Sequence, residues 1–342
     1  MQPRPLCLPY PGSINFSQAG PAGLGRANLL YRIVSFMSGS KIVVTGASGV
    51  LGTAVHKAFE KALRYEVVGL KNKSPASHLV QLDLTDKEAT KQILEEIKPT
   101  WVIHCAAERR PDVAEKDQVG TQLLNVGVPG YLGELAKAID FTLVYISTDY
   151  VFDGRSPPPG GYTPESPTNP LQIYGQTKRD GENAVLQARQ QGARTVVLRV
   201  PVLYGPAPNN ADSAVNILID VVRDQSKESN MDDYAIRYPT NVLDIASFLV
   251  RLTDLSVDTL PPILHYSAHE SFTKYQMCQI FASILGFNDM NYIKPVSTPP
   301  TGAGATSRPY NCHLSTTETE KLLPLECSGF KTWWEEYLHG GK

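Results

Sequence analysis

The sequence predicts a doubly wound α/β fold, a parallel sheet covered by helices on both faces, with a second, smaller C-terminal domain. Short and almost wholly apolar runs alternate with segments whose apolar residues recur at helical spacing. Strands that are apolar throughout are typical of a parallel sheet buried on both faces. A glycine-rich loop also joins the first apolar run to the first helical segment, and such folds bind phosphate at that loop.

Six segments are expected to form strands of this sheet. In chain order they are residues 42–45, 66–70, 79–82, 101–104, 142–146 and 195–200. After the first strand, Leu51, Val55 and Phe59 recur at helical spacing and predict a helix. Before the next helix, Thr85 and Glu88 form a capping-box pattern.

Composition excludes several classes of protein. The chain has 342 residues, enough for about two domains, and 42% are hydrophobic, enough for a sizeable core. The net charge of −2 indicates neither a nucleic-acid partner nor an anionic membrane. No apolar run approaches the roughly 18 residues of a membrane span. Five cysteines without CxxC spacing and seven scattered histidines predict no disulfide framework and no metal site.

The N-terminal leader differs from the rest of the chain. Residues 1–36 contain arginines, prolines and glycines but no acidic residue, and the first acid is Glu60. We expect residues 1–40 to be an unstructured extension, or the product of an upstream start codon with Met37 as the true start. An organelle transit peptide is the alternative.

The glycine loop predicts a dinucleotide site. Residues 46–52 read Gly-Ala-Ser-Gly-Val-Leu-Gly between the first strand and the first helix. Such glycines permit a tight turn, bring backbone N–H groups to a pyrophosphate and open the helix N-terminus toward its charge. A glycine-rich turn that binds nothing is the alternative. The strand–loop–helix context favours a Rossmann-type cofactor site that includes Gly46, Gly49 and Gly52.

The residues after the second strand favour NADP over NAD. NAD sites of this kind place an acid there for the ribose 2′-hydroxyl, whereas a 2′-phosphate requires cations. This chain has Lys71 and Lys73 and no acid in residues 70–74. A solvated lysine pair is the alternative. Asp83, just after the third strand, is placed to reach the adenine edge or, alternatively, to cap the next turn.

A threonine, a tyrosine and a lysine form a candidate catalytic site. Tyr174 and Lys178 are four residues apart and share one face of a helix. A nearby Lys⁺ lowers the pKa of a phenol, which is ordinarily about 10, and the lysine can also bind the nicotinamide ribose. Thr148 ends the fifth strand, where it can hydrogen-bond a substrate carbonyl. An exposed helix face is the ordinary interpretation of the Tyr-Lys spacing alone.

These features resemble the extended short-chain dehydrogenase/reductases over about residues 41–335. The branch that contains dTDP-4-dehydrorhamnose reductase shares the form of residues 145–154 and 174–178. Within that branch, the sequence is most similar to the regulatory beta subunits of methionine adenosyltransferase. The distinctive segments are residues 104–113, 198–205, 230–233, 237–240 and 273–275.

The resemblance implies an NADP(H) site on a domain of residues 41–204. A strand near 263–267 would return to this domain, and residues 205–335 would mainly form the smaller, substrate-binding type of domain. The residues that the resemblance assigns to the cofactor are Ser48, Gly49, Val50, Leu51, Asn72, Lys73, Ser74, Asp83, Leu84, Cys105, Arg109, Tyr174, Lys178 and Leu203. The family carries arginines where this chain has Lys71 and Lys73, and lysine lacks the bidentate fork that arginine offers to phosphate.

The function implied by the resemblance is regulation. It implies a cytoplasmic, and also nuclear, NADP-binding subunit that joins the catalytic subunit of methionine adenosyltransferase in a hetero-oligomer and modulates S-adenosylmethionine synthesis. The alternative is an NADPH-dependent nucleotide-sugar reductase that uses Thr148, Tyr174 and Lys178. The family's docking tail after the last helix is expected to be missing or very short, because the sequence ends soon after Trp333 and Trp334. Partner binding is then expected to use another surface, such as the last helix.

Overall fold

The computed structural model describes residues 39–73, 76–299 and 307–340. The compact unit Ser40–Lys342 is described here by itself. The leader of residues 1–36, Met37 and the predicted cofactor residue Ser74 lie outside the described residues.

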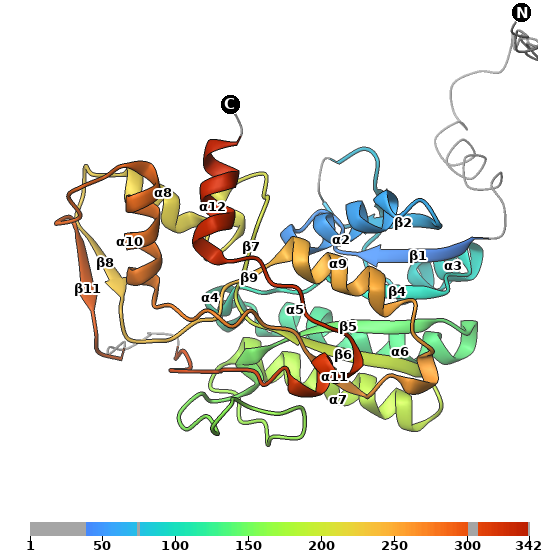
Figure 1. The fold of residues 1–342 in the computed structure, drawn as a ribbon. Coiled ribbons are helices and arrows are strands. Elements are labelled where there is room, and N and C mark those ends of the chain that lie inside the picture. Colours follow the sequence, from blue (N-terminus) through green and yellow to red (C-terminus); the bar gives the residue numbers. More distant parts are fainter. Residues whose placement is uncertain (1–38, 74–75, 300–306, 341–342) are drawn as a thin grey trace, which may run out of the picture. The chain divides into compact units, whose positions relative to one another are not determined.

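A seven-stranded sheet with only parallel pairings lies at the centre of this unit (Figure 1), in the order β10-β6-β5-β4-β1-β2-β3. Its strands are β1 (Ser40–Thr45), β2 (Tyr65–Lys71), β3 (Val80–Gln81), β4 (Trp101–His104), β5 (Thr142–Thr148), β6 (Arg194–Val200) and β10 (Ile263–His265). The chain runs outward from β1 to β3 and then crosses to β4, so the strand order reverses between β1 and β4. This topology confirms the doubly wound α/β prediction.

Helices cover both faces of the sheet. One face carries α2 (Val50–Lys61) and α9 (Val242–Leu252); the other carries α3 (Lys87–Ile97), α6 (Val128–Ile139) and α7 (Ile173–Gln190). The side chains of β1 alternate between these layers: Ile42 and Val44 pack into the α2–α9 core, whereas Val43 packs into the core of the other face. Both faces are buried, which explains why the strands are apolar throughout.

A separate core belongs to the C-terminal part of the chain. The chain enters it from the carboxyl end of β6 through β7 (Leu203–Tyr204), and Tyr204 is fully buried there. Its elements are α8 (Ile217–Arg223), α10 (Lys274–Leu285), α12 (Phe330–His339) and the paired strands β8 (Ser229–Asp232) and β11 (Ile293–Val296). The exact division into residues 41–204 and 205–335 stays a prediction.

The remaining short elements connect these layers. They are α4 (Pro111–Lys116), α5 (Gln118–Gln122), the π-helical turn η1 (Leu123–Gly127), η2 (Asp149–Val151), η3 (Asn210–Asp212), β9 (Thr240–Asn241), η4 (Val257–Thr259) and α11 (Thr317–Leu322). In the described part of the chain, every helix is too short or too polar to cross a bilayer.

One local prediction has a clear outcome. The capping prediction before α3 is wrong by one residue: Asp86 is the N-cap, and its carboxylate accepts from the Ala89 N–H at 3.0 Å. In α12, Trp334 is fully buried, whereas Trp333 is half-buried. The Trp333 ring stacks on the exposed ring of Tyr337, with 4.7 Å between the ring centroids. One tryptophan packs in the core and the other lies toward the surface.

Candidate functional site

The loop between β1 and α2 has the geometry of a phosphate-binding turn. Gly46 has a φ of 63°, and a Cβ there would lie 2.7 Å from the Ala106 nitrogen. A Cβ on Gly52 would lie 2.1 Å from the Gly46 carbonyl oxygen, so α2 reaches the loop this closely only with glycine. Among the described residues no side chain caps α2, and its first turn carries no acid. Its N-terminal N–H groups can therefore receive an anion.

The predicted residues within this loop differ in exposure. Gly49, the N-cap of α2, is exposed, Ser48 and Val50 are half-buried, and Leu51 is buried in the core. The backbone of the turn therefore faces solvent, while Leu51 anchors it to the sheet. This arrangement fits a dinucleotide pyrophosphate, which is bound mainly by backbone N–H groups.

The two lysines after β2 have different surroundings. Lys71, the last residue of β2, is buried, and its Nζ donates to the Ala76 carbonyl at 2.5 Å. Lys73 and Asn72 are exposed. Hydrogen bonds from Thr85 lower the pKa of the nearby Asp83, and the charge of Lys73 lowers it further. Lys73 is therefore the better placed of the two lysines to meet a 2′-phosphate.

Asp83 holds a turn in this structure. Its Oδ1 accepts from the Thr85 N–H at 3.0 Å and from the Thr85 hydroxyl at 2.7 Å. This is the second of the two roles that the sequence left open for Asp83. Leu84, the next residue, is buried in the core between the sheet and α3, α6 and α7.

Tyr174 lies at the start of α7, against the turn η2 that follows β5. Gly175 permits this approach, because a Cβ there would lie 2.3 Å from the Tyr150 carbonyl oxygen. Burial raises the pKa of the Tyr174 phenol, and a hydrogen bond with the Thr148 hydroxyl opposes the rise. The predicted lowering of this pKa is therefore wrong for this structure, because desolvation outweighs the nearby polar groups.

Lys178 points its ammonium at the neighbouring strand. It is 2% exposed, and its Nζ donates to the Ile146 carbonyl at 2.7 Å and lies 4.0 Å from the centroid of the Tyr145 ring. Burial lowers the pKa of Lys178 to about 7, and the charge of Glu182 opposes that change. The amine thus titrates near neutral pH.

Thr148 is engaged by its own neighbours. Its hydroxyl donates to the Asp149 carboxylate at 3.0 Å and accepts from the Tyr150 N–H at 3.2 Å. Burial raises the pKa of Asp149 to about 7, against the opposing effects of the Thr148 hydrogen bond and the charge of Arg237. While Thr148 donates its single hydroxyl proton to the Asp149 carboxylate, it has none for a substrate carbonyl.

The other predicted residues surround these groups. Cys105, the residue after β4, is half-buried and near Lys178, and desolvation raises its thiol pKa to about 12, as expected of an unreactive thiol. Arg109 is exposed, and its charge acts to lower the pKa of Tyr174. Leu203 begins β7 and is half-buried. The strand order places the glycine loop between this cluster and Lys73 with Asp83.

Three charged groups around this site were not predicted from the sequence, namely Asp149, Glu182 and Arg199. Two signals were present. Glu182 follows Tyr174 and Lys178 at the same spacing of four residues, and Arg199 interrupts an apolar strand. A charge in such a strand indicates a buried partner.

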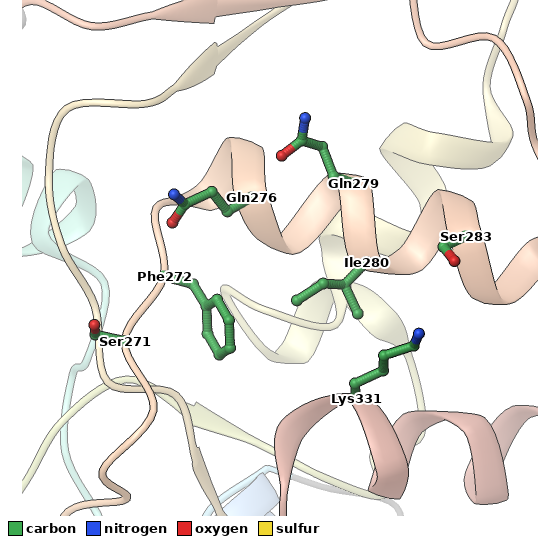
Figure 2. Close-up of a pocket in the computed structure, with 7 residues that line it drawn as sticks. All are labelled: Ser271, Phe272, Gln276, Gln279, Ile280, Ser283 and Lys331. Carbon is green, nitrogen blue, oxygen red and sulfur yellow. The ribbon is translucent and has the colours of Figure 1, made fainter.

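A surface depression lies elsewhere, between α10 and α12 (Figure 2). Its lining residues are Ser271, Phe272, Gln276, Gln279, Ile280, Ser283 and Lys331. None of them belongs to the glycine loop or to the Tyr174 cluster. Within the described residues, no group of three His, Cys, Asp or Glu side chains could hold a metal ion.

Comparison with known proteins adds independent findings. The RmlD substrate binding domain family matches residues 40–340. The chain is 40% identical to methionine adenosyltransferase 2 subunit beta of Xenopus tropicalis over 286 residues, 83% of each chain. It is 38% identical to the Mus musculus protein of that name over 300 residues, 87% of each chain. The crystal structure of dTDP-4-dehydrorhamnose reductase from Bacillus anthracis in complex with NADP has a TM-score of 0.75 and 25% identity, and covers 89% of this chain and 99% of its own.

Proposed function

The chain belongs to the family of methionine adenosyltransferase 2 beta subunits, within the RmlD-like proteins, and from this membership we propose that it is an NADP(H)-binding regulatory subunit. In this role it associates with the catalytic subunit of methionine adenosyltransferase and modulates the synthesis of S-adenosylmethionine. The observation that carries the proposal is identity of about 40% that extends over more than four fifths of both chains.

The geometry of the glycine loop supports the cofactor part of the proposal. The N–H groups at the start of α2 would bind the pyrophosphate, Lys73 would meet the 2′-phosphate, and Lys178 would bind the nicotinamide ribose. When bound, the nicotinamide supplies a hydride donor or acceptor. For a regulatory subunit the dinucleotide need only stabilise the folded form, as any ligand of the native state does.

The ionisation of the buried cluster supports regulation over catalysis. A catalytic phenol needs a pKa near the working pH, whereas burial raises that of Tyr174. Thr148 donates its proton to Asp149. This arrangement favours a binding role for the cluster in the proposal.

Association with the catalytic subunit is the direct test of this proposal. The purified chain and the catalytic subunit of the same organism are mixed with and without NADPH and examined by sedimentation velocity. We expect a complex at micromolar concentrations, with more complex when NADPH is present. Absence of a complex under both conditions would contradict the proposal.

The second candidate function is an NADPH-dependent reductase of nucleotide sugars. It is favoured by the retention of Thr148, Tyr174 and Lys178 in one cluster. A survey of dTDP-4-keto sugars with NADPH tests it by the oxidation of the dinucleotide. If turnover is found, Tyr174→Phe should reduce it by about 10²-fold, the scale of a lost acid–base catalyst. Turnover that survives this substitution would remove Tyr174 from the mechanism.

A further inference from the structure

A proline-rich loop joins η2 to α7. Its outer segment, residues 155–160, reads Arg-Ser-Pro-Pro-Pro-Gly. Five of these six residues are exposed, and Pro157 is half-buried. The loop therefore presents a serine followed by three prolines at the surface of the protein.

The base of this loop is fixed to the rest of the chain. The Tyr162 ring stacks on the Phe152 ring, with 4.2 Å between the ring centroids. The Tyr162 N–H also donates to the His313 carbonyl at 2.7 Å. At the other end of the exposed segment, the Gly154 carbonyl accepts from the Asn311 N–H at 3.0 Å. Both ends of the segment are thus held in place.

The prolines restrict the conformation of the exposed segment. The ring of each proline fixes its own φ near about −65°, and a residue that precedes proline is restricted to extended conformations. Ser156, Pro157 and Pro158 each precede a proline. The segment then turns, because the Gly161 N–H donates to the Pro158 carbonyl at 2.9 Å and Gly160 has a φ of 84°. Ser156 therefore begins a short extended segment, whose ordering costs a binding partner little entropy.

The Ser156 side chain is free to react. The residue is exposed, and across the described part of the chain no hydrogen bond joins its hydroxyl to another group. The next residue, Pro157, has no N–H with which to tie the backbone to a neighbour. An enzyme that binds a serine together with the proline after it can therefore reach both residues.

Two other residues of the same loop precede a proline, but the fold engages them. The Ser166 hydroxyl accepts from the Thr163 N–H at 2.9 Å and lies 3.3 Å from the Thr163 hydroxyl. Pro164, which follows Thr163, is buried, and its carbonyl accepts from Arg199 Nη1 at 3.2 Å. Ser166 is half-buried. Thr163 thus lacks an accessible proline, and Ser166 lacks a free hydroxyl.

We propose that Ser156 is a phosphorylation site for a protein kinase that recognises proline after the acceptor residue. The proposal does not depend on the dinucleotide or on the proposed function. The kinase supplies ATP with Mg²⁺. The Ser156 hydroxyl oxygen bonds to the γ-phosphorus while the bond from that phosphorus to the ADP oxygen breaks, and the hydroxyl proton passes to the catalytic base of the kinase. The products are ADP and a phosphoserine with a charge of about −2.

The test compares the acceptors of this loop in the folded protein and in a peptide. The full chain, and separately a peptide of residues 152–171, are treated with a purified mitogen-activated protein kinase and Mg²⁺·ATP, and each site is followed by mass spectrometry. The ratio of the Ser156 rate to the Thr163 or Ser166 rate should be at least about tenfold larger in the folded chain. The reason is that the fold must open locally before Thr163 or Ser166 can react.

Two further sites outside this loop are counted separately. Ser74 and Thr298 also precede prolines. Because mass spectrometry assigns phosphate to individual residues, modification at these positions does not enter the comparison.

Three variants test the recognition of the proline. Ser156→Ala should remove phosphate from residues 155–160. Pro157→Ala removes the side chain that the kinase must bind and should slow modification of Ser156 by about tenfold or more. Pro159→Ala is the matched control: Pro159 is exposed in the same segment but does not follow the acceptor, so the rate should stay within about twofold of wild type.

The results that would overturn the inference are distinct. Absence of phosphate at Ser156 in the folded chain would do so, as would a ratio of rates that is no larger in the folded chain than in the peptide. An unchanged rate in the Pro157→Ala variant would overturn the recognition of proline. A chain that is modified at Ser156 but forms no complex with the catalytic subunit would overturn the proposed function alone.

Discussion

The two ends of the candidate dinucleotide site differ in their chemical groups: one end presents backbone groups and the other presents buried side chains. At the glycine loop, the groups proposed to bind an anion are backbone N–H groups, Gly49 is exposed, and Lys73, the cation proposed for the 2′-phosphate, is at the surface. At the Tyr174 end, the groups are buried side chains whose pKa values are displaced by desolvation. At the loop end, the backbone N–H groups can accept an anion. At the buried end, desolvation favours the neutral forms of Tyr174, Lys178 and Asp149. The contrast agrees with the proposed regulatory role, in which the dinucleotide need not react.

The largest expected effect is at the loop end, from Gly52→Val. Its side chain would collide with the Gly46 carbonyl, since even a Cβ would lie 2.1 Å from that oxygen. We expect NADPH affinity to fall roughly hundredfold, the equivalent of an overpacking cost of about 3 kcal/mol. Calorimetry measures the affinity. Gly49→Ala is the control: Gly49 has a φ of −79°, and its Cβ would lie 3.3 Å from the same oxygen, so its effect should be much smaller.

At the buried end, Lys178→Met should change the pH dependence of stability. Burial lowers the pKa of Lys178 to about 7 from 10.5. Between these values the unfolded chain holds a proton that the native state has lost, so the lysine makes wild-type stability rise with pH in that window. The stability of the methionine variant relative to wild type should be greatest below pH about 7 and fall by roughly 3 kcal/mol toward pH about 10. Urea unfolding across this range tests it, and a difference independent of pH would contradict it.

Asp149→Asn tests the same end of the site, and its effect on stability should change with pH in the opposite direction to that of Lys178→Met. Burial raises the pKa of Asp149 to about 7 from 3.8. Because the native state binds this proton more tightly than the unfolded chain does, Asp149 contributes stability below pH about 4. That contribution is lost as pH rises through about 7. Relative to wild type, the asparagine variant should gain roughly 3 kcal/mol between pH about 4 and about 7. Thermal unfolding at both pH values measures the gain, and equal differences at the two would refute the assigned ionisation.

The smallest expected effect concerns the choice of dinucleotide at the surface. Lys73→Glu should lower the affinity for NADPH about tenfold and leave that for NADH nearly unchanged, because an exposed charge acts on the 2′-phosphate alone. Lys71→Gln is the matched control. The Lys71 ammonium is bound to the Ala76 carbonyl, so this change should cost stability and preserve the ratio of the two affinities. If Lys71→Gln changes the ratio of the NADPH and NADH affinities and Lys73→Glu does not, Lys71 and not Lys73 meets the 2′-phosphate.

The parts of the site that sequence could predict are those encoded by neighbouring residues. The alternation of strands and helices, the glycine loop and the Tyr174–Lys178 spacing each occupy a short stretch of chain, so their local pattern predicts them. The Glu182–Arg199 pair could not be predicted in this way, because it forms only when α7 packs on β6 and brings together residues 17 apart. The direction in which the pKa of Tyr174 shifts depends on burial, and the spacing of Tyr174 and Lys178 in the sequence gives no information about burial. Likewise, the hydrogen bond from Lys71 to the Ala76 carbonyl could not be predicted, because it depends on the fold of the chain after β2.

The methionine kinetics of the catalytic subunit test the proposed regulatory function most directly. Its rate of S-adenosylmethionine synthesis is measured against methionine concentration alone, with the wild-type chain, and with the Gly52→Val variant, all with NADPH. A regulatory subunit should change the kcat or KM of the catalytic subunit for methionine, and the variant, which is expected to bind NADPH poorly, should change them less. Identical kinetics with and without the wild-type chain, together with reduction of a dTDP-4-keto sugar that Tyr174→Phe abolishes, would contradict the regulatory function and establish a reductase.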